Sequence, residues 1–219
     1  MVASTGTSTA PTSRRPDPVV QRMGIGPVRF TVDDAIQMVE RGILPEDATV
    51  ELLDGEFVYR DRFDLRGSDI VEGVRHNFVV SALGELRAKV NTAVRHLRTQ
   101  STLVCSETNA PIPDAVVLRG ALVDYRERLP VAADAWCVIE VADASYERDV
   151  AEKLRGYASA GVRQYVIINL RNRTAEVYAE PDRSATTYPP ARVVGAGERL
   201  GLRVGESEYF ELTLSDILP

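Results

Sequence analysis

The spacing of apolar residues predicts helices in three parts of the chain. Between about Val74 and Arg98 apolar side chains recur every three or four residues, which is typical of a long helix with one face on the core. A shorter helix is expected from Thr31, a suitable N-cap residue, to about Arg41. A third helix is predicted over Tyr146 to Ala160, where Gly161 ends it.

Strands are predicted where short runs of β-branched and apolar residues are bounded by turn residues. The Asp54-Gly55 pair between two such runs, Val50 to Leu53 and Phe57 to Tyr59, indicates a β-hairpin. The later strands are expected at Thr102 to Cys105, Ala115 to Leu118, Ala135 to Val141, Gln164 to Asn169 and Ala175 to Ala179, followed by a β meander that ends in Tyr209 to Leu214. This order predicts an α/β domain with a mixed β-sheet core flanked by helices and a C-terminal β meander.

The composition of the chain predicts one folded domain after a short tail. Residues 1–24 are rich in serine, threonine, proline and alanine, a composition that cannot offset the entropy lost on ordering, so we expect a disordered tail. Residues 25–219 are expected to form a single domain. Because the apolar runs are too short to cross a bilayer and the first residues lack the apolar core of a signal peptide, we expect a cytoplasmic protein with no membrane association.

The charge of the chain limits the partners that it can bind. Its 26 basic and 32 acidic side chains give a net charge of −6 at pH 7, which excludes a histone-like protein that binds nucleic acid through overall positive charge. Lys89 and Lys153 are the two lysines, and the other basic residues are arginines. An arginine-biased composition explains most of this skew. The lysines are still informative, because a buried lysine can lose its proton whereas an arginine stays charged.

Two acidic residues interrupt or adjoin apolar strands. Glu140 lies within the apolar run from Ala135 to Val141, and Asp114 follows two prolines at the entry of the strand that begins at Ala115. A buried carboxylate needs a cation or hydrogen bonds, and two carboxylates on neighbouring strands repel unless a divalent cation lies between them. With two histidines and two cysteines in the whole chain a zinc site is not expected, so the acids indicate Mg²⁺ or Mn²⁺.

The third candidate group is Lys153, on the helix that follows Glu140. Asp149, Lys153 and Tyr157 are spaced four residues apart and therefore share one helix face. A desolvated lysine can orient or deprotonate a water molecule. The alternative is that Asp149 and Lys153 form an exposed ion pair worth about 0.2–0.5 kcal/mol. The helix pattern leaves both interpretations open.

Taken in order, these residues resemble the Uma2 family of predicted restriction endonucleases, which belongs to the PD-(D/E)XK nuclease superfamily. The resemblance covers about Phe30 to Tyr178, and it rests on Pro113-Asp114, Val138-Ile139-Glu140-Val141, Asp149, Lys153, Tyr157 and Gly161-Val162, with Glu51 to Glu56 and His76 nearer the N-terminus. It implies a restriction-endonuclease-like fold. It also implies that Asp114, Glu140 and the backbone carbonyl of Val141 hold the metal ion, with Lys153 as the active-site lysine.

The superfamily pattern also bears on the position of the lysine and on a third acid. Its lysine usually lies two residues after the acid on the same strand, a position that is Ala142 here, so Lys153 corresponds to a lysine moved to the next helix. Glu51 resembles the additional acidic residue that the superfamily supplies from its N-terminal part, and would complete the metal shell.

Three further candidates have two interpretations each. Asp149 either holds Lys153 in place or forms an exposed pair with it. Tyr157 either donates a hydrogen bond to the site or packs the helix on the sheet, and His76 is either a capping or packing residue or a catalytic one.

The function implied by the resemblance is hydrolysis of DNA phosphodiester bonds by a Mg²⁺- or Mn²⁺-dependent endonuclease. We expect DNA as the partner and a homodimer as the assembly. The alternative is a catalytically degenerate domain that keeps the nuclease fold and acts as a binding or regulatory module. The acidic surface predicts weak, salt-sensitive association with DNA, whereas the presence of Asp114, Glu140 and Lys153 together favours the enzyme.

Overall fold

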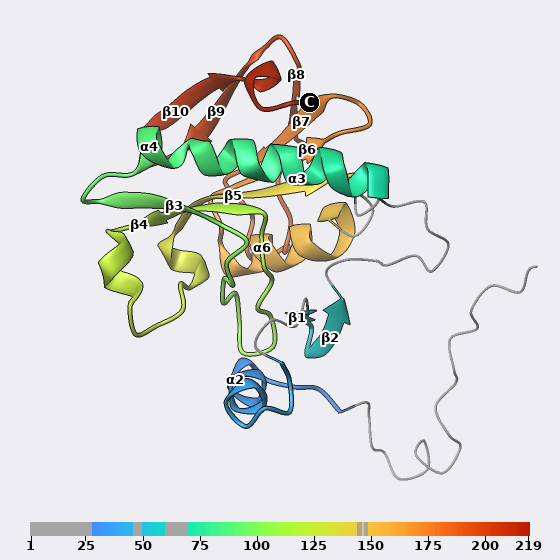
Figure 1. The fold of residues 1–219 in the computed structure, drawn as a ribbon, viewed down its shortest axis with the longest axis vertical. Coiled ribbons are helices and arrows are strands. Elements are labelled where there is room, and N and C mark those ends of the chain that lie inside the picture. Colours follow the sequence, from blue (N-terminus) through green and yellow to red (C-terminus); the bar gives the residue numbers. More distant parts are fainter. Residues whose placement is uncertain (1–27, 46–49, 60–69, 144–145, 147–148) are drawn as a thin grey trace, which may run out of the picture.

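The computed structural model describes residues 28–45, 50–59, 70–143, 146 and 149–219. Their fold is built around a six-stranded β-sheet (Figure 1). The tail predicted for residues 1–24 lies outside this part of the chain. In order across the sheet the strands are β3 (Arg95–Thr99), β4 (Ala115–Arg119), β5 (Ala135–Ala142), β6 (Gln164–Asn169), β7 (Thr174–Ala179) and β8 (Arg192–Gly195). Neighbouring strands are antiparallel except for β5 and β6, which are parallel. The predicted α/β fold with a mixed sheet is confirmed.

Helices cover the two faces of the sheet (Figure 1). The α3 helix (Ile70–Glu85) lies on one face, and the other face is covered by η3, a π-helical turn (Asp149–Lys153), with α6 (Leu154–Ala160). Successive side chains of β5 alternate between the two cores, because Ile139 packs with residues of α3 and Val138 with residues of α6. All eight residues of β5 are buried, as expected for a central strand covered on both faces.

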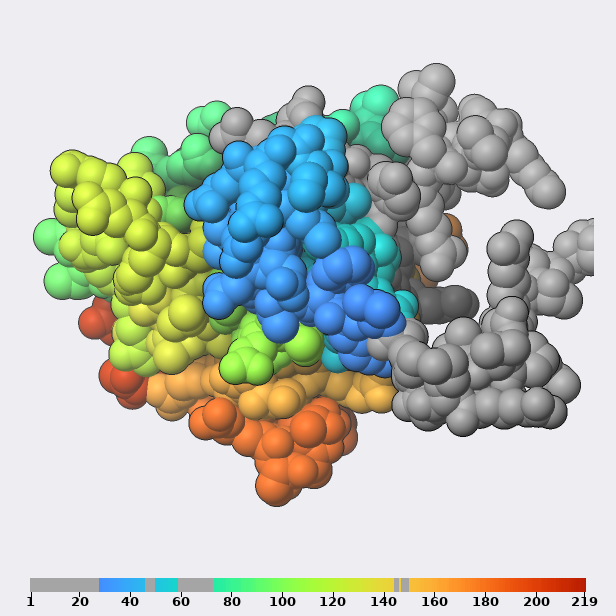
Figure 2. Space-filling model, turned by 90° about the horizontal axis from the view of Figure 1, so that it is seen from below, coloured from blue at the N-terminus to red at the C-terminus, as the bar shows by residue number. Residues whose placement is uncertain are grey.

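The remaining elements extend this core at its ends. The short elements are α4 (Arg87–Val90) before β3, η1 (Leu122–Tyr125) and η2 (Ala132–Asp134) between β4 and β5, and η4 (Leu214–Asp216) near the C-terminus. At the C-terminal end β9 (Arg199–Arg203) pairs with β10 (Tyr209–Thr213) in a separate two-stranded sheet. The N-terminal helix α2 (Val32–Glu40) lies on the outside of the molecule beside the segment around residues 120–130 (Figure 2). Within the described ranges, every helix is too short or too polar to span a membrane.

The predicted hairpin at Asp54-Gly55 is present as β1 (Val50–Leu53) and β2 (Glu56–Tyr59). Asp54 and Gly55 both have positive φ angles, 48° and 78°, as a two-residue type I′ turn requires. The hairpin is fixed to the body of the protein by Leu52 and Ala110, whose backbones exchange hydrogen bonds. This contact places β1 beside the loop that leads into β4.

The long helix predicted from Val74 to Arg98 is wrong in its second half. The α3 helix ends at Glu85, α4 adds one turn, and the chain then reverses into strand β3. The reversal is a turn in which the Thr92 amide donates to the Arg95 carbonyl at 2.8 Å. The spacing of Leu97 continued the helical pattern by coincidence, and pairing with β4 decides the conformation.

The strand predicted at Thr102 to Cys105 is also wrong. Its amides donate to carbonyls in two different segments, to Asn109 and Pro111 in one and to Pro130 in the other, so no continuous ladder forms. Val104 makes an isolated bridge to Val131. The apolar run is therefore an ordered loop rather than a strand.

Candidate active site

Two buried acids lie side by side at one end of the central strands. Ala115 of β4 pairs with Ile139 of β5, so the next step of the antiparallel ladder places Asp114 opposite Glu140. The Val141 amide donates to Oδ2 of Asp114 at 2.8 Å, which ties the two strand ends together. Both acidic side chains are about as buried as the surrounding core, with 3% of each residue exposed.

Lys153 lies between two of the predicted acids. Its Nζ is 3.0 Å from Oε1 of Glu140 and 3.0 Å from Oε1 of Glu51. The lysine is 4% exposed, so the interpretation as an exposed pair with Asp149 is wrong for Lys153. The side chain of Asp149 lies outside the described residues. An ammonium shared by two carboxylates supplies the cation that a buried acid needs.

Glu51 is fully buried and only partly satisfied. Its Oε1 atom accepts hydrogen bonds from Lys153 and from the Ile112 amide, the latter at 2.8 Å. Its Oε2 atom is buried and has no hydrogen-bond partner among the described residues. An unsatisfied buried carboxylate oxygen is costly, so this atom is an acceptor that a cation or a donor group would stabilise.

Tyr157 donates a hydrogen bond to the same acid as Lys153. Its hydroxyl is 2.9 Å from Oε1 of Glu140, four residues along the helix from the lysine, which confirms that both residues share one face. Burial raises the pKa of Tyr157 well above its usual value, and the charge of Glu140 raises it further. The hydroxyl therefore stays protonated and holds the Glu140 carboxylate in one orientation.

His76 contacts the other acid. It projects from α3, and its Nε2 lies 3.0 Å from Oδ2 of Asp114, the oxygen that also accepts from the Val141 amide. This contact requires a proton on Nε2 when the carboxylate is ionised. The structure thus brings His76 into the candidate site.

The donor atoms fit a hard divalent cation. Asp114, Glu140 and the Val141 carbonyl are all oxygen donors, the type that Mg²⁺ and Mn²⁺ prefer. The unsatisfied Oε2 of Glu51 adds another oxygen beside Lys153. In the described part of the chain no group of three or more His, Cys, Asp and Glu side chains is arranged to hold a metal ion, so a backbone carbonyl or water would have to complete the shell.

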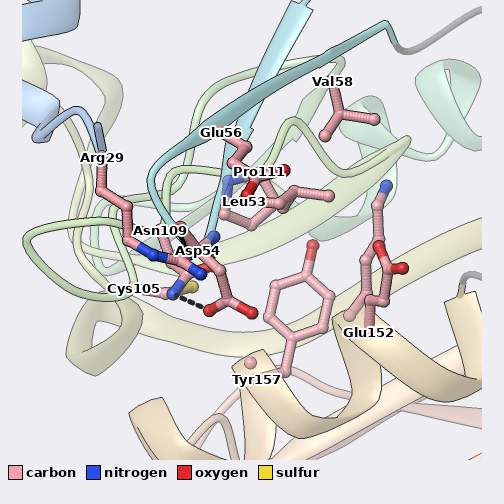
Figure 3. Close-up of a pocket in the computed structure, with 12 residues that line it drawn as sticks. Arg29, Leu53, Asp54, Glu56, Val58, Cys105, Asn109, Pro111, Glu152 and Tyr157 are labelled. Carbon is pink, nitrogen blue, oxygen red and sulfur yellow. Dashed lines mark hydrogen bonds between the residues drawn. The ribbon is translucent and has the colours of Figure 1, made fainter. Parts of the chain in front are cut away.

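A pocket of about 470 Å³ opens beside Lys153 (Figure 3). It lies between the β1–β2 hairpin and the η3–α6 helix, with Lys153 and Tyr157 in its wall. Asp114 and Glu140 are not among its lining residues, so the pocket reaches the site from the lysine side. The other lining residues are Arg29, Leu53, Asp54, Glu56, Val58, Cys105, Asn109, Pro111, Glu152 and Gly156.

Asp54 and Asn109 shape one side of this pocket, a pairing that the sequence does not reveal. Asn109 accepts from the Asp54 amide at 2.9 Å and donates to Oδ1 of Asp54 at 3.1 Å. The two residues are 55 positions apart, and no motif links them. The Asp54-Gly55 pair was interpretable as a turn, but its place beside the lysine follows from the docking of the hairpin.

Cys105 is expected to resist alkylation by iodoacetamide in mildly alkaline buffer. Burial, with the charge of Glu140, raises the pKa of its thiol to about 12, and the thiolate is the reactive form. Mass spectrometry of the native protein should find Cys105 unmodified, whereas the urea-unfolded chain should be labelled at both Cys105 and Cys137. Rapid labelling of native Cys105 would contradict the raised pKa of its thiol.

A solved protein structure has a fold similar to that of this chain. A solved structure, that of "a putative nuclease belonging to DUF820 from Anabaena variabilis ATCC 29413", matches with a TM-score of 0.61 and 15% identity over 86% of this chain and 97% of that chain. At this identity the likeness concerns the fold alone. The comparison with curated proteins finds no match.

The family comparison covers most of the chain. The Uma2 model, described as "Putative restriction endonuclease", matches residues 37–215, a range that contains Asp114, Glu140 and Lys153. This match supports a nuclease function. The chain belongs to the Uma2 family.

Proposed function

We propose that this protein is an endonuclease that uses Mg²⁺ or Mn²⁺ to hydrolyse phosphodiester bonds in DNA. The observation that carries the proposal is the buried Lys153 ammonium held by Glu51 and Glu140, beside a strand end where Asp114 accepts from the Val141 amide. An ion pair with only a structural role would not need Asp114 opposite Glu140. It would also not need the Oε2 atom of Glu51 buried without a hydrogen-bond partner among the described residues. This combination favours a site that binds a cation and substrate.

The residues that would hold the metal ion are Asp114, Glu140 and, through its carbonyl, Val141. A bound divalent cation lowers the pKa of a coordinated water and neutralises negative charge on the phosphate. His76 and the Val141 amide fix the Asp114 carboxylate by two hydrogen bonds to Oδ2. The Tyr157 hydroxyl fixes Glu140 in the same way.

Lys153 is the group that would act on the reacting atoms. It would orient the attacking water or stabilise negative charge that develops on the phosphate oxygens. Because the site is buried, an ammonium there acts in a low-dielectric environment in which each charge interaction is stronger than in water. An arginine could not replace it as a compact donor.

We also propose that the protein acts in the cytoplasm. Cys105 and Cys137 are free thiols, as is usual in reducing compartments, which supports a cytoplasmic enzyme. The homodimer expected from the sequence stays a prediction.

Incubation of the purified protein with supercoiled plasmid tests the function. With Mg²⁺ or Mn²⁺ we expect nicked and then linear DNA, and with EDTA we expect no change, as followed by gel electrophoresis. Cleavage that is equally fast in EDTA would contradict the metal-dependent mechanism. A folded, metal-loaded protein that leaves every DNA substrate intact would favour the degenerate binding module instead.

A further inference from the structure

We propose that the pocket beside Lys153 receives an unpaired base of the DNA, so that the enzyme cuts single-stranded or locally unpaired DNA in preference to duplex. This inference rests on the proposed nuclease function and specifies the class of DNA that the site takes. The size of the pocket, the chemistry of its walls and rim, and its position next to the candidate catalytic residues support it.

The pocket has the size and walls of a site for a flat, partly apolar group. Its volume of about 470 Å³ falls within the range of small-molecule sites and exceeds what a single base needs. Leu53 and Val58 are partly exposed and supply apolar surface, whereas Pro111 and the Tyr157 ring are buried in the wall (Figure 3). An apolar wall of this kind suits the face of an unstacked base.

The rim of the pocket is acidic. Asp54, Glu56 and Glu152 are exposed and line it, with Asp54 and Glu152 on opposite sides of the Tyr157 ring (Figure 3). A duplex presents phosphates on its outside, and phosphates against these carboxylates would be repelled. A base presents N–H donors on its edge instead, and carboxylates accept from the amino groups of cytosine and adenine. The rim therefore favours the edge of a base over a phosphate group.

Asp54 is positioned in advance as such an acceptor. Asn109 holds its amide and its Oδ1 atom, and Arg29 donates to its backbone carbonyl. The carboxylate thus has little freedom to lose when it accepts a hydrogen bond from a ligand. Arg29, which also lines the pocket, supplies a positive charge beside Asp54.

The pocket and the candidate catalytic groups share residues. Lys153 and Tyr157 line the pocket, and both donate to Oε1 of Glu140. A base in the pocket would therefore bring its own phosphate next to Lys153. In duplex DNA the same placement requires breaking a base pair and a stack, which costs free energy that single-stranded DNA does not have to supply.

The test compares three DNA substrates of one sequence: a single strand, a fully paired duplex, and a duplex with one bulged nucleotide. With the full-length protein and Mg²⁺ or Mn²⁺ we expect the single strand to be cut at least about tenfold faster than the duplex, and the bulged duplex to be cut at the unpaired nucleotide. Equal or faster cleavage of the paired duplex, with no product from the Lys153→Met variant, would overturn the base pocket while the nuclease function stands.

A second measurement does not depend on cleavage. Single-stranded oligonucleotides that carry the fluorescent base 2-aminopurine are titrated in EDTA, where a base entering the pocket changes its emission. We expect binding to the single strand but not to the duplex, and we expect Asp54→Asn to weaken it at least about fivefold. Glu40→Gln, which removes one exposed charge on α2, should leave binding unchanged. Binding that is the same for both DNA forms, or insensitive to Asp54→Asn, would overturn the proposal even if no DNA is cut.

Discussion

Replacing Lys153 by methionine is expected to abolish plasmid cleavage and to lower the free energy of unfolding by about 3–5 kcal/mol. The ammonium lies 3.0 Å from an oxygen of Glu51 and 3.0 Å from an oxygen of Glu140, and both acids are buried. Its removal leaves two carboxylates without the cation between them, which is the situation in which loss of one partner of a buried pair is most destabilising. Plasmid cleavage and urea denaturation measure the two effects.

Two further variants separate chemistry from stability. In the double variant Lys153→Met with Glu51→Gln one of the two acids is neutral, so part of the lost stability should return while cleavage stays absent. Lys89→Met is the matched control, because Lys89 is exposed on α4 and its loss should change neither measurement. Cleavage that returns along with stability in the double variant would show that Lys153 has a structural role alone.

Asp114→Asn is expected to abolish the heat of Mn²⁺ binding in titration calorimetry, or to weaken the affinity by at least about tenfold. Asparagine keeps an oxygen that can accept from the Val141 amide, so the strand ends remain joined, but it removes the negative charge that a hard cation needs. The thermal midpoint should therefore change little while the metal affinity falls.

Asp143→Asn provides the matched control for this titration. Asp143 is a nearby buried acid at the end of β5, and its Oδ1 accepts from Nε of Arg171 at 2.8 Å rather than from a residue of the candidate metal site. Its amide variant should bind Mn²⁺ as the wild type does. Unchanged Mn²⁺ binding in Asp114→Asn would exclude Asp114 as a metal ligand.

The strands that hold the acids could be predicted from the sequence because the signal is local. An acid within a continuous apolar run marks Glu140 as a buried charge, and a buried charge implies a partner. The spacing of Lys153 and Tyr157 predicted that the two residues share one helix face, and their hydrogen bonds to Glu140 confirm this. Each of these inferences uses residues within one strand or one helix.

The contacts that could not be predicted join distant segments. Glu51 meets Lys153 because the hairpin docks against Ala110 and Ile112, and nothing in the spacing of β1 shows this docking. His76 on α3 contacts Asp114, which directly precedes β4. The spacing of residues along α3 does not predict this contact.

The misassigned second half of the long helix has a related cause. Helical spacing of apolar residues cannot by itself exclude a strand. Pairing of β3 with β4 is a tertiary interaction that overrides the local preference.

The place of the lysine in the connection between β5 and β6 has a mechanical consequence. A lysine on the same strand as the acid would keep its distance to that acid even if a neighbouring helix shifted. Here the ammonium is carried by the helical crossover that joins two parallel strands, with Glu152 of the pocket rim as its immediate neighbour in the same turn. A ligand that displaced this crossover on entering the pocket would therefore also change the distance between the Lys153 ammonium and the Glu140 carboxylate.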